Sequence, residues 1–172
     1  MRFAFVTTNL AGGGAEKALL KTAAALRSRG NEADIWLLED KIEHAVPAGV
    51  PVYTVGCTSH GWLHKRLTAC RLRGRIRARD PYDLIVSTLP FADEVTHLAK
   101  LPRHWCRIAN TLSAEIESLS RINSRKAVRR QARYLRLYSA CPLIAVSEGV
   151  SEDLHQNFQV PSRIETIPNP FD

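Results

Sequence analysis

Residues 2–38 have the sequence RFAFVTTNLAGGGAEKALLKTAAALRSRGNEADIWLL, and this stretch decides the fold. Its apolar and β-branched start predicts a strand over residues 2–8. Small and apolar residues at helical spacing predict a helix over residues 15–28, and Gly30 provides its stop signal. The apolar run over residues 33–38 predicts a second strand. A strand, a helix and another strand in this order form the crossover unit of a parallel sheet.

The same alternation continues along the rest of the chain. Further strands are predicted over residues 52–55, 83–88, 106–109, 143–146 and 164–167. Helices are predicted over residues 62–79, 92–98, 122–139 and 147–158. The strands are apolar almost throughout, as expected when helices cover both faces of a sheet. We therefore predict one α/β domain, doubly wound and Rossmann-like, with a mostly parallel sheet of about seven strands.

Composition indicates a globular protein that is not embedded in a membrane. The chain has 172 residues, of which 45% are hydrophobic and 24% charged, enough for one domain with a core. No apolar run reaches the roughly 18 residues of a membrane span. The apolar N-terminal run is too short for a signal peptide. We expect a cytoplasmic protein.

Cysteine and histidine spacing predicts no metal site. Cys57, Cys70, Cys106 and Cys141 form no C-x-x-C pair, so free and mostly buried thiols are expected rather than a zinc site or a disulfide framework. His60 and His64 could share a helix face. No third ligand follows at a supporting spacing, and ordinary surface histidines are the favoured interpretation.

Positive charge is concentrated in two segments. The net charge is +7, yet residues 65–79 and 121–136 each hold seven basic residues and no acidic one. Outside them, 10 basic residues are outnumbered by 17 acidic ones. In the first segment we expect the helix to dock through Leu63, Leu67 and Cys70. In the second we expect a stripe of arginines opposite a docking face, with the stripe formed by Arg121, Arg125, Arg129, Arg133 and Arg136 and the docking face by Val128, Leu135 and Tyr138.

Such runs point to an anionic partner, because like charges repel unless an anion is near. Anionic lipid headgroups, a lipid-linked pyrophosphate or lipopolysaccharide acceptor, and nucleic acid are the candidates, and a solvated face is the plain alternative. Nucleic acid is disfavoured, since the sequence has no helix-turn-helix, zinc pattern or aromatic RNA-binding motif. A membrane surface or an anionic acceptor is therefore predicted to bind Arg66, Arg73, Arg77, Arg125, Arg129 and Arg133.

Three glycines, Gly12, Gly13 and Gly14, separate the first strand from the first helix. Ligands of doubly wound folds bind at the carboxyl ends of the strands, and a helix N-terminus favours an anion. A tight turn without a ligand is the alternative. The stretch fits neither the dinucleotide pattern G-x-G-x-x-G nor the triphosphate loop G-x-x-x-x-G-K-[ST]. Glu16 suits the positive end of the helix, either as part of the site or only as a stabilising charge.

Three segments in order resemble the N-terminal half of retaining glycosyltransferases of the GT-B fold, family 4. They are residues 11–38 (AGGGAEKALLKTAAALRSRGNEADIWLL), 143–154 (LIAVSEGVSEDL) and 164–172 (IETIPNPFD). In that family a G-G-x-E segment follows the first strand, as at Gly13–Glu16 here. A capping serine ends a later strand, as at Ser147, and an I-P-N-P-[FV]-D segment leads into the second domain, as at residues 167–172. The resemblance covers essentially the whole chain.

The resemblance implies a domain organisation and an activity. Residues 1–167 would form the acceptor-side domain and residues 168–172 the start of a linker, with the donor-binding domain beyond this chain. The full protein would transfer a sugar from a nucleotide sugar to a saccharide or lipid-linked acceptor in cell-envelope polysaccharide, lipopolysaccharide or glycolipid assembly. It would work at the inner face of the cytoplasmic membrane without a bound cofactor or metal. This piece alone would be inactive. A non-catalytic anion-binding or membrane-adaptor module is the alternative.

The resemblance also implies site residues. Gly12–Gly14 would lie near the donor diphosphate and the acceptor. Many members have a histidine after the strand predicted at residues 106–109; Ala109 or Asn110 takes that position here. Asparagine can hydrogen-bond a sugar hydroxyl but cannot act as a general base, so the catalytic residue is left unassigned. A turn or helix cap is the alternative for Asn110 and Thr111.

Other strand ends supply the remaining candidates. Ser87 and Thr88 close a central strand, where they are expected either to line the cleft or to cap a helix. Ser147 is expected to cap a helix, and Glu148 beside it is expected to reach an acceptor hydroxyl. The predicted donor- and acceptor-binding set is Gly12, Gly13, Gly14, Glu16, Ser87, Thr88, Asn110, Thr111, Ser147 and Glu148.

Overall fold

Strand β1 (Arg2–Thr7) pairs in parallel with β2 (Glu32–Leu37) on one side and with β4 (Leu84–Thr88) on the other. The computed structural model describes residues 1–172 apart from 58, 60, 159, 161, 162, 171 and 172. The other strands are β3 (Val52–Thr54), β5 (His104–Ile108), β6 (Leu143–Ala145) and β7 (Ile164–Thr166). The seven-stranded order is β3-β2-β1-β4-β5-β6-β7, which confirms the Rossmann-like fold class.

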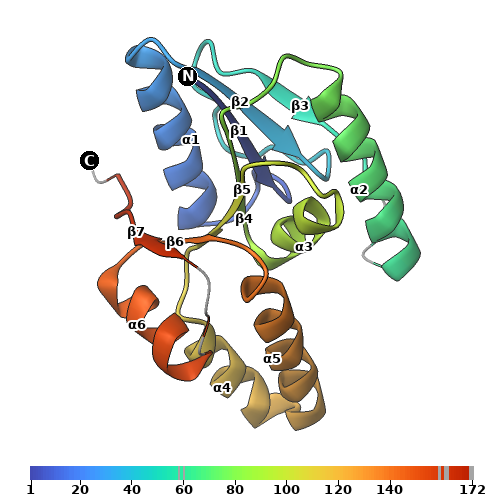
Figure 1. Ribbon diagram of the computed structural model, residues 1–172, viewed down its shortest axis with the longest axis vertical. Coiled ribbons are helices and arrows are strands. Elements are labelled where there is room, and N and C mark those ends of the chain that lie inside the picture. The colour runs from blue at the N-terminus through green and yellow to red at the C-terminus, as the bar shows by residue number, and fades with distance from the viewer. Residues whose placement is uncertain (58, 60, 159, 161–162, 171–172) are drawn as a thin grey trace. The chain divides into compact units, whose positions relative to one another are not determined.

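Six helices are described, and Figure 1 labels them. They are α1 (Gly14–Ser28), α2 (Trp62–Arg77), α3 (Pro90–Leu98), α4 (Leu112–Ile122), α5 (Ser124–Tyr138) and α6 (Glu148–Asn157). Around β1, α1 lies on one face of the strands and α2 with α3 on the other (Figure 1). Ala4 and Val6 accordingly share a buried cluster with Leu72 of α2 and Val95 of α3.

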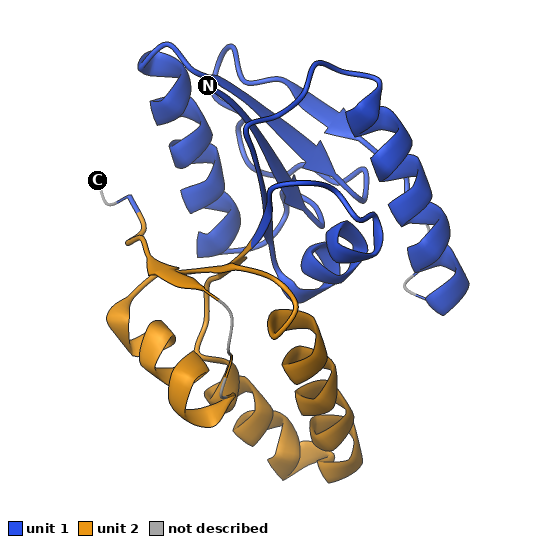
Figure 2. Cartoon of the chain, viewed as in Figure 1, with its two compact units in different colours: residues 1–105, 170–172 blue, residues 106–169 orange. Residues whose placement is uncertain are grey.

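The chain divides into two compact units, coloured separately in Figure 2. Unit 1 comprises residues 1–105 and 170–172, and unit 2 comprises residues 106–169. Each unit has its own buried core. In unit 1, Trp36, Leu72 and Ile85 are among the most buried side chains. In unit 2, Tyr134 and Leu143 are among the most buried side chains.

One helix was not predicted. Residues 112–122 form α4, and the helix predicted to begin at residue 122 begins at Ser124. The side chain of Asn123 accepts a hydrogen bond from the backbone N–H of Lys126 and caps α5. Leu112, Ile116 and Leu119 stand at helical spacing in α4, so its sequence carries a helical signal that the prediction did not use. As a consequence Arg121 belongs to α4, where it pairs with Glu117 at 2.6 Å, and not to the arginine stripe.

The predicted docking faces of both basic helices were wrong in part. Helix α2 buries Thr68, Ala69, Leu72 and Ile76, while Leu63, Leu67 and Cys70 are exposed. Helix α5 buries Ala127, Tyr134, Leu137 and Tyr138, so Tyr138 was placed correctly, but Val128 and Leu135 are exposed. Each helix packs through small residues, Ala69 and Ala127, that allow a close approach. A count of large apolar residues does not identify such a face.

Burial of the cysteines is mixed. Cys106 and Cys141 are buried, Cys57 is half-buried and Cys70 is exposed. The prediction of mostly buried thiols therefore holds for two of the four.

The corrected face of α2 gives a stability prediction. Leu72→Ala removes a fully buried side chain from the core of unit 1 and should lower the free energy of unfolding by about 2–5 kcal/mol. Leu67→Ala, on the same helix but 48% exposed, is the matched control and should cost less than about 1 kcal/mol. Urea denaturation of both variants measures the difference, and equal costs would contradict the assigned face.

A buried tyrosine gives a pH prediction. Tyr82 donates a hydrogen bond to the Asp34 carboxylate at 2.6 Å, and burial together with this bond raises the pKa of Tyr82. The folded protein therefore retains a proton that the unfolded chain releases above about pH 10. The stabilisation is therefore complete below that pH. Above it, the free energy of unfolding should fall by roughly 1 kcal/mol per pH unit. Urea denaturation from pH 8 to 11 should show this fall.

Burial also raises the pKa of Tyr134 in unit 2, so a Tyr82→Phe/Tyr134→Phe variant should have a flatter profile of stability against pH. Identical profiles would exclude both tyrosines as the cause.

Candidate functional site

The strand order reverses between β1 and β4, and the loop after β1 leaves the sheet at this switch point. Gly13 is the N-cap residue of α1, and no side chain caps that end of the helix. All three glycines, Gly12, Gly13 and Gly14, are exposed. The first N–H groups of α1 have no partner within the helix, so they are available to a ligand acceptor.

The loop before α1 is held in place by its neighbours. Asn9 accepts a hydrogen bond from the N–H of Ala11 at 3.1 Å and donates one to Glu39 at 2.8 Å. His44 Nε2 lies 2.8 Å from the carbonyl oxygen of Gly12, and only a protonated Nε2 can make this bond. The loop is therefore ordered by the protein itself. His44 comes from a distant loop, and no local sequence pattern could have indicated its position.

The three glycines have different structural roles. A Cβ at Gly12 would overlap the Glu16 carboxyl group, with Cδ only 2.6 Å away. A Cβ at Gly13 or Gly14 would meet nothing within 4 Å. A side chain at Gly12 would therefore displace the Glu16 carboxyl group, whereas one at Gly13 or Gly14 would displace nothing. At Gly13 and Gly14 the missing side chain leaves exposed backbone open to approach from outside.

Glu16 carries an unpaired buried carboxylate. The residue is 5% exposed, and no other residue of the described chain donates a hydrogen bond to it or forms an ion pair with it. Thr7, at the end of β1, is also buried, and its Oγ1 has no hydrogen-bond partner among the described residues. Unpaired buried polar groups lower stability, and each requires an explanation. Both groups lie where β1 leads into α1; the Thr7 hydroxyl is fully enclosed, whereas the Glu16 oxygens keep some contact with solvent.

Ser87 and Thr88 are buried at the end of β4. Ser87 Oγ donates a hydrogen bond to Asp93 at 2.5 Å and lies 2.8 Å from His104 Nε2. This network joins β4 to α3 and β5, and His104 was not among the sequence candidates because β5 begins two residues earlier than predicted. The Ser87 hydroxyl thus has an internal structural role, and a ligand contact by Ser87 or Thr88 stays a prediction.

In unit 2, β5 and β6 are parallel, with Ile108 opposite Ala145. The segments that follow them, Asn110–Thr111 and Ser147–Glu148, therefore leave the same edge of the sheet and are all exposed. Ser147 Oγ accepts a hydrogen bond from the N–H of Val150 at 3.3 Å, which confirms the predicted cap. Thr111 is the N-cap residue of α4 without a side-chain hydrogen bond, so its hydroxyl is available to a ligand.

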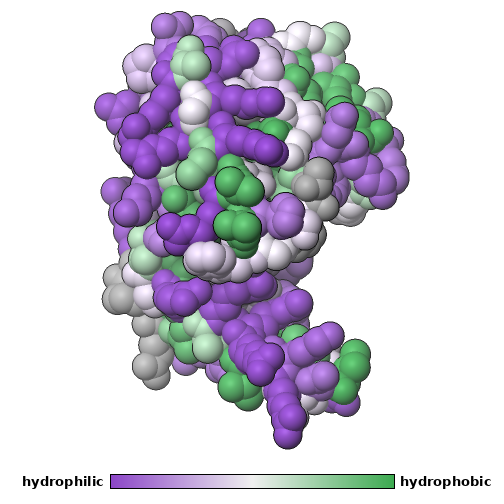
Figure 3. All heavy atoms as spheres, turned by 90° about the vertical axis from the view of Figure 1, so that its right-hand side faces the viewer, coloured by the Kyte–Doolittle hydropathy of each residue, from purple (hydrophilic) through white to green (hydrophobic). Residues whose placement is uncertain are grey.

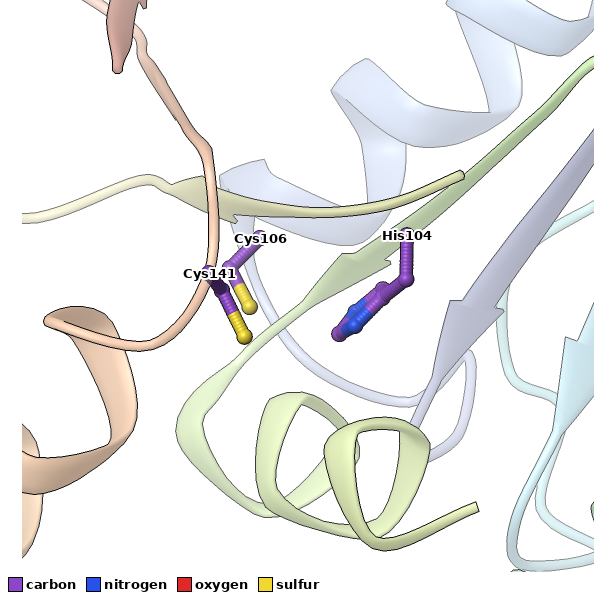
Figure 4. A group of neighbouring side chains, drawn as sticks. All are labelled: His104, Cys106 and Cys141. Atoms are coloured by element: carbon purple, nitrogen blue, oxygen red, sulfur yellow. The ribbon is translucent and has the colours of Figure 1, made fainter. Parts of the chain in front are cut away.

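Two thiols of unit 2, Cys106 on β5 and Cys141 before β6, point toward one another in Figure 4. Their sulfur atoms lie within 4.8 Å of each other. The figure also labels His104, which belongs to unit 1 and contacts Ser87 there. Residues 106 and 141 are far apart in sequence, so spacing gave no sign of this pair. Of the predicted histidine pair, residue 60 lies outside the described residues, and the absence of a metal stays a prediction.

Helix α2 presents both charge and apolar surface to solvent. Arg66 stacks over the exposed ring of Trp62 at 5.1 Å, and Arg77 is exposed, whereas Arg73 is half-buried. Leu63 and Leu67 are 59% and 48% exposed. Figure 3 shows hydrophobic side chains among hydrophilic ones on the face that carries α2.

Helix α5 keeps much of the predicted arginine stripe. Arg125 and Arg129 are exposed, and Arg133 is half-buried with its guanidinium 5.6 Å from the Tyr134 ring. Arg130 instead pairs with Glu115 at 2.6 Å. Helix α5 therefore presents Arg125 and Arg129 to solvent and holds Arg130 in an ion pair with Glu115.

Comparison with known proteins identifies the family and supports the fold. The family profile of Glycosyltransferase Family 4 matches residues 12–172. The chain belongs to this family. No curated protein sequence matches the chain. None of the described helices has the length and apolar character needed to cross a bilayer.

Solved glycosyltransferases share the fold. HepE of Anabaena, solved in complex with UDP and glucose, is 23% identical over 100% of this chain and 45% of its own, with a TM-score of 0.62. Sucrose-phosphate synthase of Thermosynechococcus elongatus is 13% identical over 98% of this chain and 48% of its own, with a TM-score of 0.66. A glycosyltransferase of Rickettsia africae is 14% identical over 97% and 42%, with a TM-score of 0.65. The chain thus spans less than half the length of each.

Proposed function

We propose that this chain is the acceptor-side part of a retaining glycosyltransferase that uses a nucleotide sugar as co-substrate. The observation that carries the proposal is the start of α1, where exposed glycines leave backbone N–H groups open at the switch point of the sheet. Family membership supports the reaction class. HepE, which shares the fold, binds UDP and glucose, and this favours a nucleoside diphosphate sugar as the donor.

In unit 1, the N–H groups at Gly13 and Gly14 contact the donor diphosphate. In unit 2, Asn110 or Ala109 takes the position of the family's histidine, and an Asn110 amide would hydrogen-bond a sugar hydroxyl. Glu148, exposed beside the Ser147 cap, would accept a hydrogen bond from an acceptor hydroxyl. No protein nucleophile, metal or tightly bound cofactor is assigned to the reaction.

The glycine turn gives the test of this proposal. Gly13→Val adds a side chain that meets no protein atom, so the free energy of unfolding should change by less than about 1 kcal/mol. The same side chain would block a phosphate from the N–H groups, and UDP binding should weaken at least tenfold. Isothermal titration with UDP measures this. Gly74→Val, at another exposed glycine with nothing within 4 Å, is the control and should bind UDP normally. Full UDP binding by Gly13→Val would remove the turn from the mechanism.

The acceptor is proposed to be a saccharide or a lipid-linked saccharide of the cell envelope, reached at the cytoplasmic face of the membrane. On α2, the aromatic ring of Trp62 and the apolar Leu63 and Leu67 accompany the cations of Arg66 and Arg77. Basic helices with exposed apolar residues bind anionic bilayers through charge and partial insertion. In unit 2, the exposed Arg125 and Arg129 of α5 would provide a separate electrostatic contact with the bilayer.

Vesicle binding tests this membrane contact. The chain should co-sediment with phosphatidylglycerol vesicles, and binding should weaken with added salt because lipid attraction is about 1 kcal/mol per cation. Arg129→Glu/Arg133→Glu should weaken binding more than tenfold. Arg27→Glu/Arg29→Glu, an equal change of charge at the C-terminal end of α1, should have a smaller effect. Binding that is independent of salt and of Arg129 and Arg133 would contradict the assignment.

A further inference from the structure

The start of α1 contains a conflict between two charges. The proposed function places a diphosphate at this end of the helix, yet the protein already has a carboxylate there, that of Glu16. A carboxylate in the first turn neutralises part of the positive end of a helix. It also repels a second anion, and burial strengthens the repulsion because screening by water is reduced. A phosphate can therefore approach Gly13 and Gly14 more easily than it can approach Gly12, over which the Glu16 carboxyl group lies.

The environment of Glu16 indicates what its carboxylate lacks. Ionised carboxylates only accept hydrogen bonds, and no described residue donates one to this group. Unlike Thr7 Oγ1, the Glu16 oxygens are not shut off from solvent, so a ligand can reach them. A role limited to helix stabilisation would not explain the burial, because an exposed glutamate in the first turn interacts with the dipole without the cost of desolvation.

The backbone around Glu16 is arranged for close approach. Gly12 must lack a side chain for the carboxyl group to occupy its place, and Gly12 itself is exposed. His44 holds the Gly12 carbonyl at 2.8 Å, so the glycine does not need to be ordered when a ligand arrives. The group that completes this site must be a hydrogen-bond donor without negative charge.

We infer that Gly12 and Glu16 form a subsite for the hydroxyl groups of a neutral saccharide, next to the diphosphate contact at Gly13 and Gly14. This inference rests on the proposed function, which supplies the saccharide. Glu16 thereby acts as a specificity residue: its carboxylate accepts hydrogen bonds from sugar hydroxyls and keeps phosphate away from the Gly12 side of the turn.

Neutralising the carboxylate tests the inference. Two probes are used: pyrophosphate, measured by isothermal titration, and glucose, measured by saturation-transfer NMR. In Glu16→Gln, pyrophosphate should bind at least tenfold more tightly than in the unmodified chain. In Glu16→Ala, the glucose signal should fall at least threefold, because no acceptor is left. Glu117→Gln, an exposed glutamate on α4, is the control and should change neither probe.

Gly12→Ala provides a second route to the same result. Its Cβ would displace the Glu16 carboxyl group while leaving the residue present, so it should weaken the glucose signal as Glu16→Ala does. Thermal unfolding of each variant verifies that it is folded. Unchanged pyrophosphate and glucose binding in Glu16→Gln, Glu16→Ala and Gly12→Ala would overturn the inference and leave Glu16 with a structural role only.

The outcomes separate this inference from the proposed function. If Gly13→Val abolishes UDP binding but no Glu16 variant changes either probe, the glycosyltransferase proposal survives and the hydroxyl subsite is excluded. If glucose binding depends on Glu16 but Gly13→Val leaves UDP binding unchanged, the subsite survives and the diphosphate contact at the glycine turn fails.

Discussion

Parallel pairing of β1 with both β2 and β4 is the constraint on which the rest of the molecule depends. Each parallel pair requires a crossover, so the chain must leave the end of β1, form α1 and return on one face of the sheet. The next crossovers cover the other face with α2 and α3. Reversal of the strand order at β1 then directs the N-terminus of α1 toward the ligand edge, and every candidate contact at the glycine turn follows from this placement.

Buried polar side chains of unit 1 differ in their hydrogen bonding between the interior and the edge where β1 leads into α1. Tyr82 with Asp34, and Ser87 with Asp93, complete their hydrogen bonds inside the fold and fix the neighbouring elements. Glu16 does not, although it is as deeply buried. Incomplete hydrogen bonding is costly in a core, and it is useful at a site where a ligand supplies the missing donor.

The basic helices show how packing and surface chemistry compete for the same residues. Helix α2 docks through Ala69, Leu72 and neighbouring small side chains, and this choice leaves Leu63 and Leu67 outside. Apolar side chains that do not enter the core remain available to another apolar phase. Their position among arginines is the basis of the membrane contact proposed for this face.

The sequence by itself determined the alternation of strands and helices, the α/β class, the family and the glycine turn, because periodicity and turn residues act over short distances. It also identified the Ser147 cap, a contact between residues three apart. Only the tertiary structure decided which face of α2 and α5 is buried and that His44 reaches Gly12. It alone showed that Gly12 differs from Gly13 and Gly14. That difference arises because the Glu16 side chain folds back over Gly12, and a run of three glycines in a sequence does not indicate where a later side chain will lie.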